Sequence, residues 1–418
     1  FGAAFGRAVG AHGARARRLR TALVVAEIAL TVVLLAGAGL LLRSYAAVLA
    51  VDPGFDAEGV LLVDTPLSPS RYPNAVDRDA FYRRVLERVR AMPGVESAGY
   101  TNFAPLVIKG LRSVTFIEGR PRPTQEEMFR TVAQDRGVSP GYFETLRVPL
   151  VSGRFIDARD TRDAPLVALV NEAMVRVHWP DGDPLGKQLR FGLGGIDRVF
   201  TVVGVVGDMR QDGLDAPSFP EVYAPLDQLG PAGEFSLMWP GELVVRTSGD
   251  PAALGAAVRR AVWDIDPDQP VASVRPLSEV LDVELAGRNM QLALLGAFAL
   301  LALVLAAVGL YGTLSYTVSQ STNEIGLRMA LGARQQTVVG TVVRSALGTA
   351  ALGIGLGLLA AYGLTRTIES FLYEVSPTDP ATAVAVAGTL LLVAGIAAFV
   401  PARRAASINP VVALRADG

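Results

Sequence analysis

Residues 319–339 read Ser-Gln-Ser-Thr-Asn-Glu-Ile-Gly-Leu-Arg-Met-Ala-Leu-Gly-Ala-Arg-Gln-Gln-Thr-Val-Val, a polar and basic segment between two long apolar segments. Glu324 and Arg328 stand four positions apart in the order that stabilises a helix, and Gly332 follows as a left-handed C-cap. The pattern predicts a short amphipathic helix over residues 323–331. Composition alone favours a solvated loop beside the lipid headgroups. The choice between that loop and a functional helix therefore depends on the architecture of the rest of the chain.

Long apolar segments organise the rest of the chain, of which 50% is hydrophobic. The first, residues 21–42, exceeds the apolar core of about 7–15 residues that a signal peptide carries. Each of the four apolar segments has at least the roughly 20 residues that cross a bilayer as a helix. We therefore expect a membrane protein with four transmembrane α-helices.

The expected organisation places a large α+β extracytoplasmic domain between the first and second helices. In order, it comprises a cytoplasmic basic tail (1–20), transmembrane helix 1 (21–42), the extracytoplasmic domain (43–287), transmembrane helix 2 with a stalk (288–318), a cytoplasmic coupling loop (319–341), transmembrane helix 3 (342–364), a short external loop (365–380), transmembrane helix 4 (381–400) and a cytoplasmic tail (401–418).

The second apolar segment, residues 290–318, is longer than a bilayer requires. As a helix with a rise of about 1.5 Å per residue it measures roughly 43 Å, against a hydrocarbon core of about 30 Å. Tilt could absorb the difference. Because Arg288 and Asn289 lead directly back into the polar domain, we expect the helix to project from the membrane as a stalk.

Arginine residues set the expected orientation. The N-terminal tail, the segment around Arg328 and Arg334, and the tail after Arg403 are all basic. Four transmembrane helices place these three regions on one side, which is then the cytoplasm. The remaining short loop, 365–380, carries three acidic residues and one arginine, as expected for the outside.

The polar middle of the chain predicts two similar strand–helix–strand units. The first helix, expected over 77–92, places Phe81, Val85 and Val89 on one face. The second, expected over 251–265, begins with Asp250 as N-cap and Pro251 at the first helical position. The units predict one α+β subdomain built from both ends of the region, with a second, mostly β subdomain inserted between.

Several kinds of chemistry are missing from the sequence. Its closest approach to a phosphate-binding loop, Gly182-Asp-Pro-Leu-Gly-Lys-Gln, has the wrong spacing and lacks the hydroxyl that holds magnesium. His12 and His178 are the two histidines, and there is no cysteine. The segment 264–275 starts like a calcium-binding EF-hand but ends on Arg275 instead of Glu. We expect no enzyme activity, no cofactor and no metal in this chain.

Three residues within the apolar segments stand out. Glu27 is an acid about two turns from the basic end of the first helix; it is expected to reach the interface or to bond to a neighbouring helix, with a transport role as the alternative. Gly353 and Gly357 have the GxxxG spacing that suits close helix packing, although a segment so rich in glycine does not identify the partner helix.

The segment Asn323-Glu-Ile-Gly-Leu-Arg-Met-Ala-Leu-Gly-Ala-Arg334 resembles the signature of FtsX-like permeases, the membrane subunits of MacB-type ABC transporters. Other motifs resemble the same family in its external domain and in its membrane part. They include Val51-Asp-Pro-Gly-Phe55, Val138-Ser-Pro-Gly-Tyr-Phe143, Val202-Val-Gly-Val-Val-Gly-Asp208, Gly309-Leu-Tyr-Gly312, Pro377-Thr-Asp-Pro380 and Asn409-Pro-Val-Val-Ala-Leu-Arg415.

The resemblance implies a permease of the bacterial cytoplasmic membrane that works beside a separate ABC-type ATPase subunit, which binds ATP and magnesium. It implies a second permease half, either upstream in the same chain or as a homodimer mate, and no nucleic-acid partner. ATP hydrolysis would move the extracytoplasmic domain for export or mechanical work. The implied ATPase-docking residues are Glu324, Ile325, Arg328, Met329, Leu331, Gly332, Ala333 and Arg334.

Two further readings of the sequence remain open. The chain could serve as an FtsX-like transmembrane signalling protein that regulates an extracytoplasmic enzyme, or as a static membrane-anchored domain for which the coupling loop is dispensable. The start of the chain resembles the middle of duplicated permeases, which predicts that it is the C-terminal half of such a protein.

Overall fold

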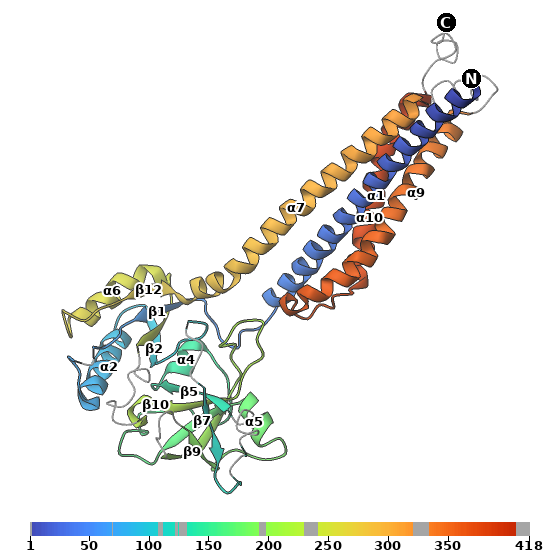
Figure 1. Ribbon diagram of the computed structural model, residues 1–418. Coiled ribbons are helices and arrows are strands. Elements are labelled where there is room, and N and C mark those ends of the chain that lie inside the picture. The colour runs from blue at the N-terminus through green and yellow to red at the C-terminus, as the bar shows by residue number, and fades with distance from the viewer. Residues whose placement is uncertain are drawn as a thin grey trace. The chain divides into compact units, whose positions relative to one another are not determined.

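The computed structural model describes residues 2–68, 70–107, 112–121, 124, 132–191, 198–229, 241–320 and 334–406. The chain forms two compact units. One comprises Phe1–Ala50 and Gly287–Gly418, and the other comprises Val51–Ala286. The first unit contains long helices and the second is built on a β-sheet (Figure 1).

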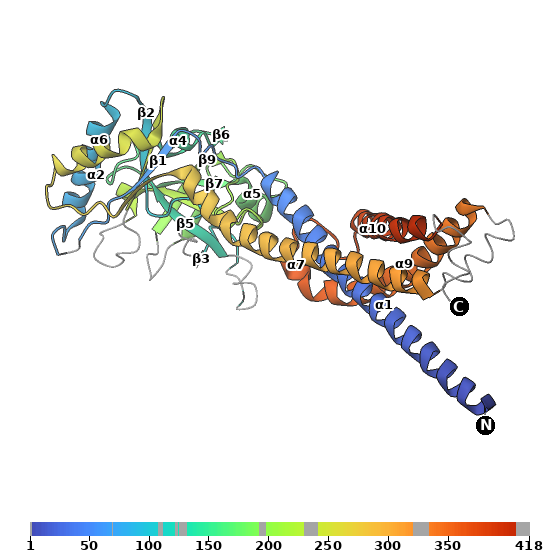
Figure 2. The ribbon, with the colours of Figure 1, turned by 90° about the horizontal axis from the view of Figure 1, so that it is seen from above.

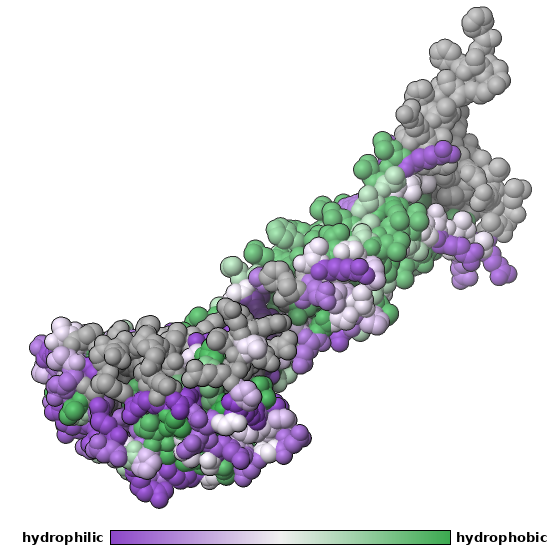
Figure 3. Space-filling view, turned by 60° about the horizontal axis from the view of Figure 1, so that its bottom comes forward, coloured by the Kyte–Doolittle hydropathy of each residue, from purple (hydrophilic) through white to green (hydrophobic). Residues whose placement is uncertain are grey.

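Among the described residues, four helices are long and apolar enough to cross a membrane. Figure 3 shows hydrophobic side chains gathered over them. The expected fold class, four transmembrane helices with an α+β domain between the first and second, is confirmed. The helices are α1 (Gly2–Leu49), α7 (Leu277–Gln320), α9 (Gln335–Leu364) and α10 (Pro380–Ala406), and the 3-10 helix η3 (Thr365–Phe371) follows α9.

The helical unit has one apolar core, to which all four helices contribute. α1, α9 and α10 lie side by side (Figure 1), and α7 adds one stripe of residues. The buried members are Val24, Ile28 and Val32 of α1, Ala306, Leu310 and Leu314 of α7, Ala346, Ala350 and Ile354 of α9, and Val386, Leu390, Ala394 and Ala398 of α10.

The sequence places the end of the last transmembrane helix at residue 400, because Pro401 follows and proline commonly ends a helix, but the helix does not end there. α10 continues through Pro401 to its end at Ala406. Proline removes one backbone hydrogen bond and crowds the carbonyl four residues earlier. Here Ala398 and Ala402 are both 0% exposed, so close packing of this turn holds the helix together across the proline.

Three other helices extend beyond their apolar segments, so the helix ends differ from the expected transmembrane boundaries, which stay predictions. α1 begins inside the expected basic tail, α7 begins at Leu277 inside the expected domain, and α9 begins at Gln335 inside the expected coupling loop. Hydropathy marks the part of a helix that suits lipid. The helix itself continues wherever its backbone hydrogen bonds can form.

The second unit contains twelve strands and five short helices among its described residues. The strands are β1 (Val60–Asp64), β2 (Val95–Thr101), β3 (Arg112–Val114), β4 (Phe116–Ile117), β5 (Val132–Val138), β6 (Leu150–Gly153), β7 (Val167–Asn171), β8 (Gln188–Phe191), β9 (Arg198–Val206), β10 (Glu221–Pro225), β11 (Glu242–Thr247) and β12 (Ser273–Pro276). The helices are α2 (Ala75–Arg90), α4 (Tyr142–Leu146), α5 (Glu172–His178), α6 (Pro251–Trp263) and the 3-10 helix η1 (Leu226–Gln228).

The two predicted strand–helix–strand units are neighbours in the sheet, whose order is β12-β1-β11-β2-β5-β10-β7-β9-β8-β4. α2 and α6 lie together over one face (Figure 2). Phe81, Val85 and Val89 of α2 are 0% exposed, as their spacing predicts. Asp250 accepts a hydrogen bond from the Ala252 N–H at 2.9 Å, which is the predicted N-cap of α6.

The inserted part of the domain continues the same sheet. β2 and β5 join it through one paired position, Thr101 with Val138, and the Asn102 side chain accepts a bond from the Gly137 N–H at 2.9 Å. β5 and β10 pair in parallel. The sequence did not predict either strand, because both carry charged residues that interrupt the hydrophobic pattern.

The start of α7 belongs to the core of the β-sheet unit. Leu277 is 1% exposed and Val280 is 5% exposed, and both lie in a cluster with Leu62, Val244 and Met209. This cluster is on the side of the sheet opposite α2 and α6, because Leu62 and Val244 alternate with residues that face those helices. α7 is therefore anchored by buried side chains before it enters the helical unit.

Candidate functional site in the helix bundle

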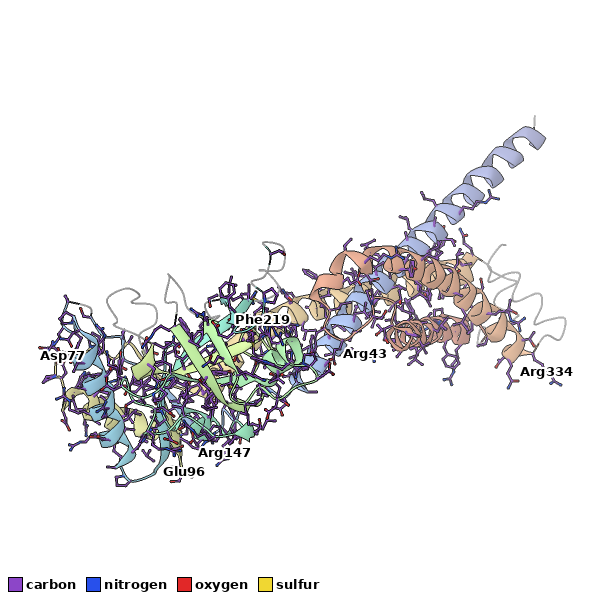
Figure 4. All side chains as sticks on the ribbon, turned by 90° about the horizontal axis from the view of Figure 1, so that it is seen from below. Arg43, Asp77, Glu96, Arg147, Phe219 and Arg334 are labelled. Carbon is purple, nitrogen blue, oxygen red and sulfur yellow. The ribbon has the colours of Figure 1, made fainter. Side chains whose placement is uncertain are left out.

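Most of the predicted ATPase-docking residues, from Glu324 to Ala333, lie outside the described residues. Arg334 is described: it is exposed, directly precedes α9, and its carbonyl accepts a bond from the Thr337 N–H at 2.9 Å. Figure 4 places Arg334 and Arg43 at opposite ends of the helix bundle. The docking site thus remains a prediction, adjoining the first turn of α9.

α1 and α9 meet through the two glycines of the GxxxG pair. A Cβ added at Gly353 would lie 2.8 Å from the Cβ of Ile28, and one added at Gly357 would lie 2.6 Å from the Cβ of Val32 and 2.7 Å from the Ala29 carbonyl oxygen. Real Cβ atoms do not approach so closely, so both positions admit only glycine while the helices keep this spacing. Backbone meets backbone along this line, as small residues permit in membranes.

Glu27 faces α7. A Cβ added at Gly309 of α7 would overlap the Glu27 carboxylate and would lie 3.3 Å from its Cδ atom. One turn further along α1, the Thr31 hydroxyl donates to the Glu27 carbonyl at 2.8 Å and lies 3.2 Å from the Ala302 carbonyl of α7. Of the roles expected for Glu27 (reaching the interface, bonding to a neighbouring helix, or transport), this geometry fits contact with a neighbouring helix.

Arginines contact tyrosines at one end of the bundle. The Arg20 guanidinium lies 4.2 Å from the centre of the Tyr316 ring, which is a cation–π distance. Arg404 of α10 donates to the Tyr311 hydroxyl at 3.2 Å. Both tyrosines belong to α7. Tyrosine is favoured at membrane–water interfaces, so these contacts mark one edge of the apolar layer.

An ion pair lies at the other end of the helix bundle. Arg43 of α1 pairs with Asp379, and the Tyr373 N–H donates to the Ser44 hydroxyl at 2.8 Å. Hydrogen bonds from Thr382 and from Arg43 lower the pKa of Asp379 to about 2. Arg20 and Arg43 are 23 residues apart on α1, or about 35 Å along a helix, close to the thickness of a bilayer core of about 30 Å.

These bundle contacts were only partly foreseeable. Asp379 is recognisable as the N-cap of α10, and its carboxylate does accept the Thr382 N–H at 2.7 Å. Its pairing with Arg43 has no local signal, because the two residues are far apart in the chain. Gly309 is visible in the sequence as part of Gly309-Leu-Tyr-Gly312, but nothing near it indicates that Glu27 is its neighbour.

The domain contains a buried charged cluster that the sequence did not reveal. Arg136 of β5 and Glu221 of β10 are both 0% exposed, with Nε and Oε1 3.8 Å apart. The Tyr223 hydroxyl donates to Glu221. Burial raises the pKa of Glu221 to about 7 and that of Glu242 to about 7. Near neutral pH each of these two carboxyls is therefore partly protonated.

The segment that begins like an EF-hand has another role. Asp266 accepts a bond from Arg71 at 2.6 Å and one from the Tyr72 hydroxyl at 2.6 Å, so it ties the loop before α2 to the end of α6. Across the described residues, no group of three His, Cys, Asp or Glu side chains could hold a metal ion.

Two family models match the chain. The MacB-like periplasmic core domain matches residues 21–261, and the FtsX-like permease C-terminal domain matches residues 296–410. The first match begins in α1 and covers most of the β-sheet unit. The second begins within α7 and runs past the end of α10.

Curated relatives match over much of this chain. The macrolide export ATP-binding/permease protein MacB of Azoarcus sp. (strain BH72) is 28% identical over 357 residues, which are 82% of this chain and 50% of that protein. The pyoverdine export ATP-binding/permease protein PvdT of Pseudomonas syringae pv. syringae (strain B728a) is 25% identical over 273 residues, or 64% of this chain and 40% of that protein. The chain spans about half the length of the curated relatives it matches.

Two solved structures each align with more than half of this chain. The periplasmic region of MacB from Actinobacillus actinomycetemcomitans aligns with 57% of this chain and 97% of its own, at 13% identity and a TM-score of 0.38. The extracellular domain of the ABC-type transporter YknZ from Gram-positive bacteria aligns with 52% of this chain and 98% of its own, at 15% identity and a TM-score of 0.33.

Proposed function

Because the chain belongs to the family of the MacB-like periplasmic core domain, we propose that it is the permease subunit of an ABC transporter. A separate ATPase subunit binds ATP and magnesium and docks on the segment from Glu324 to Arg334. Hydrolysis of ATP moves α7 and, through it, the extracytoplasmic domain. The movement serves export or mechanical work across the membrane.

One observation carries this proposal: α7 is a single helix of 44 residues. At about 1.5 Å per residue it measures about 66 Å. At its start, Leu277 and Val280 are buried in the core of the domain. At its end, Gln320 lies four positions before Glu324, the first of the residues that the sequence predicts to dock on the ATPase. A displacement at that end therefore has a continuous mechanical connection to the domain.

The proposed orientation follows the basic residues. Arg20 and Arg404 lie at the end of the bundle where α7 finishes, and Arg334 begins α9. By the positive-inside rule this end faces the cytoplasm, with both termini of the given chain on that side. We place the protein in the bacterial cytoplasmic membrane, where a second permease half completes the transporter, either in the same chain or as a homodimer mate.

The test measures ATPase stimulation in lipid nanodiscs that contain the full chain and its co-purified ATPase subunit. The variant Glu324→Lys with Gly332→Pro reverses the docking charge and removes the helix stop. We expect this variant to lose stimulation while it still assembles in the membrane. The matched control, Glu374→Lys, reverses an exposed charge on the loop at the other end of the bundle and should couple normally. Normal coupling of the docking variant would overturn the proposal.

A further inference from the structure

α7 is held in the bundle less completely than α1. In the apolar part of α7, 11% of the residues are buried, against 39% in α1. Its exposed apolar face includes Leu294, Phe298, Leu301, Leu305 and Val308, each more than half exposed. The contacts that do hold α7 to α1 therefore have a large share in determining where α7 lies.

Three of those contacts are made by polar side chains of α1 and follow one line. Arg20 lies on Tyr316, Glu27 lies against Gly309, and the Thr31 hydroxyl reaches the Ala302 carbonyl. Along α7 these three positions are seven residues apart, which returns to the same helix face after two turns. We call this line of three contacts the α1–α7 polar seam. Because its three positions share one face of α7, the seam follows the line along which the two antiparallel helices meet.

Glu27 is the central member of the seam and the one that apolar surroundings tolerate least. A carboxyl group within a membrane helix is favoured only where it meets other polar groups. Gly309 has no side chain, so the carboxyl can approach the backbone of α7. If α7 moves away, Glu27 loses this position. The carboxyl therefore favours a placement of α7 that keeps Gly309 opposite it.

We infer that Glu27 is a positioning residue that latches α7 to α1 through the notch at Gly309, and that this latch opens when α7 moves. The inference rests on the proposed function for the movement, but the latch itself is a property of the resting protein. Thr31 and Arg20 support it on either side. No transported molecule needs to touch Glu27 for this role.

The resting latch can be measured by electron paramagnetic resonance distances, because the chain has no native cysteine. Spin labels at Leu30→Cys of α1 and Leu301→Cys of α7 occupy exposed positions. The full chain with its ATPase subunit, in nanodiscs and without nucleotide, should give one short distance. Glu27→Leu should lower the equilibrium constant between the latched and the released placement of α7 about threefold, the size expected for one interhelical polar contact, and so shift population away from that distance. Thr341→Val, which removes an exposed hydroxyl on α9 bonded within its own helix, should change nothing.

Rescue separates a latch from a general structural role. Glu27→Gln keeps the shape and the hydrogen-bonding capacity of the side chain and should keep most of the short-distance population. Gly309→Ala should reduce it, and Glu27→Leu should add little in that background, because both changes remove the same contact.

The two hypotheses fail in different ways. An unchanged resting distance in Glu27→Leu, or effects of Glu27→Leu and Gly309→Ala that simply add, would overturn the latch. A normal latch whose distance does not respond to ATP in the wild-type complex would instead overturn the proposed function.

Discussion

α1 makes two different kinds of contact within the same bundle. Towards α9 it presents Ile28 and Val32 to two glycines, and the backbones come together. Towards α7 it presents Arg20, Glu27 and Thr31, and the contacts are made by the ends of side chains. The first interface has no room to change without separating the helices. The second combines these side chains with an apolar stripe of α7 formed by Ala306, Leu310 and Leu314, and its polar part can be undone by side-chain rotation.

The difference indicates which parts of the bundle move together. Tightly packed interiors resist small displacements because each atom has close neighbours, so α1 and α9 should act as one body. Beside its apolar stripe, α7 is joined to that body by the few directional contacts of the α1–α7 polar seam. α7 is also the helix whose other end lies in the core of the domain. We therefore regard α7 as the moving element and α1 with α9 as the frame.

The largest effect is expected for Gly357→Leu. Its Cβ would lie 2.6 Å from the Cβ of Val32, so α9 must shift away from α1, which should destabilise the bundle by about 3 kcal/mol, the upper range for overpacking. Gly355→Leu is the matched control, because no atom lies within 4 Å of a Cβ at Gly355. Unfolding in detergent by increasing SDS measures both. Equal stability of the two variants would show that the α1–α9 interface is not close-packed.

Val280→Ala tests the opposite end of α7. Val280 is 5% exposed in the core of the domain, and loss of its two methyl groups should cost about 2 kcal/mol through lost burial and the cavity that remains. Val283→Ala is the control, because Val283 is 66% exposed on the same helix. Chemical unfolding of the full chain, followed by tryptophan fluorescence, gives the difference. If both variants behave alike, α7 is not anchored in the domain.

Acid–base behaviour should also distinguish the domain from the bundle. The pKa of Glu221 and that of Glu242 are raised to about 7 by burial, above their unfolded value of 4.5. The folded state therefore binds more protons. This contribution to stability is fully present below about pH 4.5 and is lost as pH rises from there through 7, by at most about 1.4 kcal/mol per pH unit and carboxyl. The midpoint of chemical unfolding should fall between about pH 5 and pH 7.5 and level off at higher pH. Glu242→Gln should flatten the profile, and an unchanged slope would exclude Glu242 as a source.

The smallest effect on stability is expected for Gly309→Ala. An added Cβ would meet the end of the Glu27 side chain, which can rotate away, and alanine favours the helical backbone by about 1 kcal/mol over glycine. The net change in SDS unfolding should stay below about 1 kcal/mol. A loss as large as that of Gly357→Leu would mean that the two interfaces of α1 are equally tight.

Local sequence predicted where helices form better than it predicted which helices pack against each other. The apolar segments and arginines located all four transmembrane helices, and Asp250 with Pro251 located the start of α6. The spacing of Gly353 and Gly357 indicated close packing but not that α1 is the partner, because register between helices depends on side chains distant in sequence. For the same reason Glu27 could be recognised as unusual but not placed against Gly309.

Two further failures have physical causes of their own. β5 and β10 were not predicted because Asp135, Arg136 and Glu221 are charged and yet buried. A search for alternating apolar residues does not recognise a strand whose buried positions are charged. Pro401 was expected to end its helix, whereas packing of Ala398 and Ala402 outweighs the lost hydrogen bond. Tertiary contacts overrode the local pattern in both cases.

The central claim is that α7 moves against a frame of α1 and α9. Spin-label distances in the full chain with its ATPase subunit, in nanodiscs, test it by comparing Leu30→Cys/Leu301→Cys with Leu30→Cys/Leu356→Cys, all exposed positions. On addition of ATP the α1–α7 distance should change and the α1–α9 distance should stay the same. A change in the α1–α9 distance, or an α1–α7 distance that does not respond while ATP is hydrolysed, would contradict the claim.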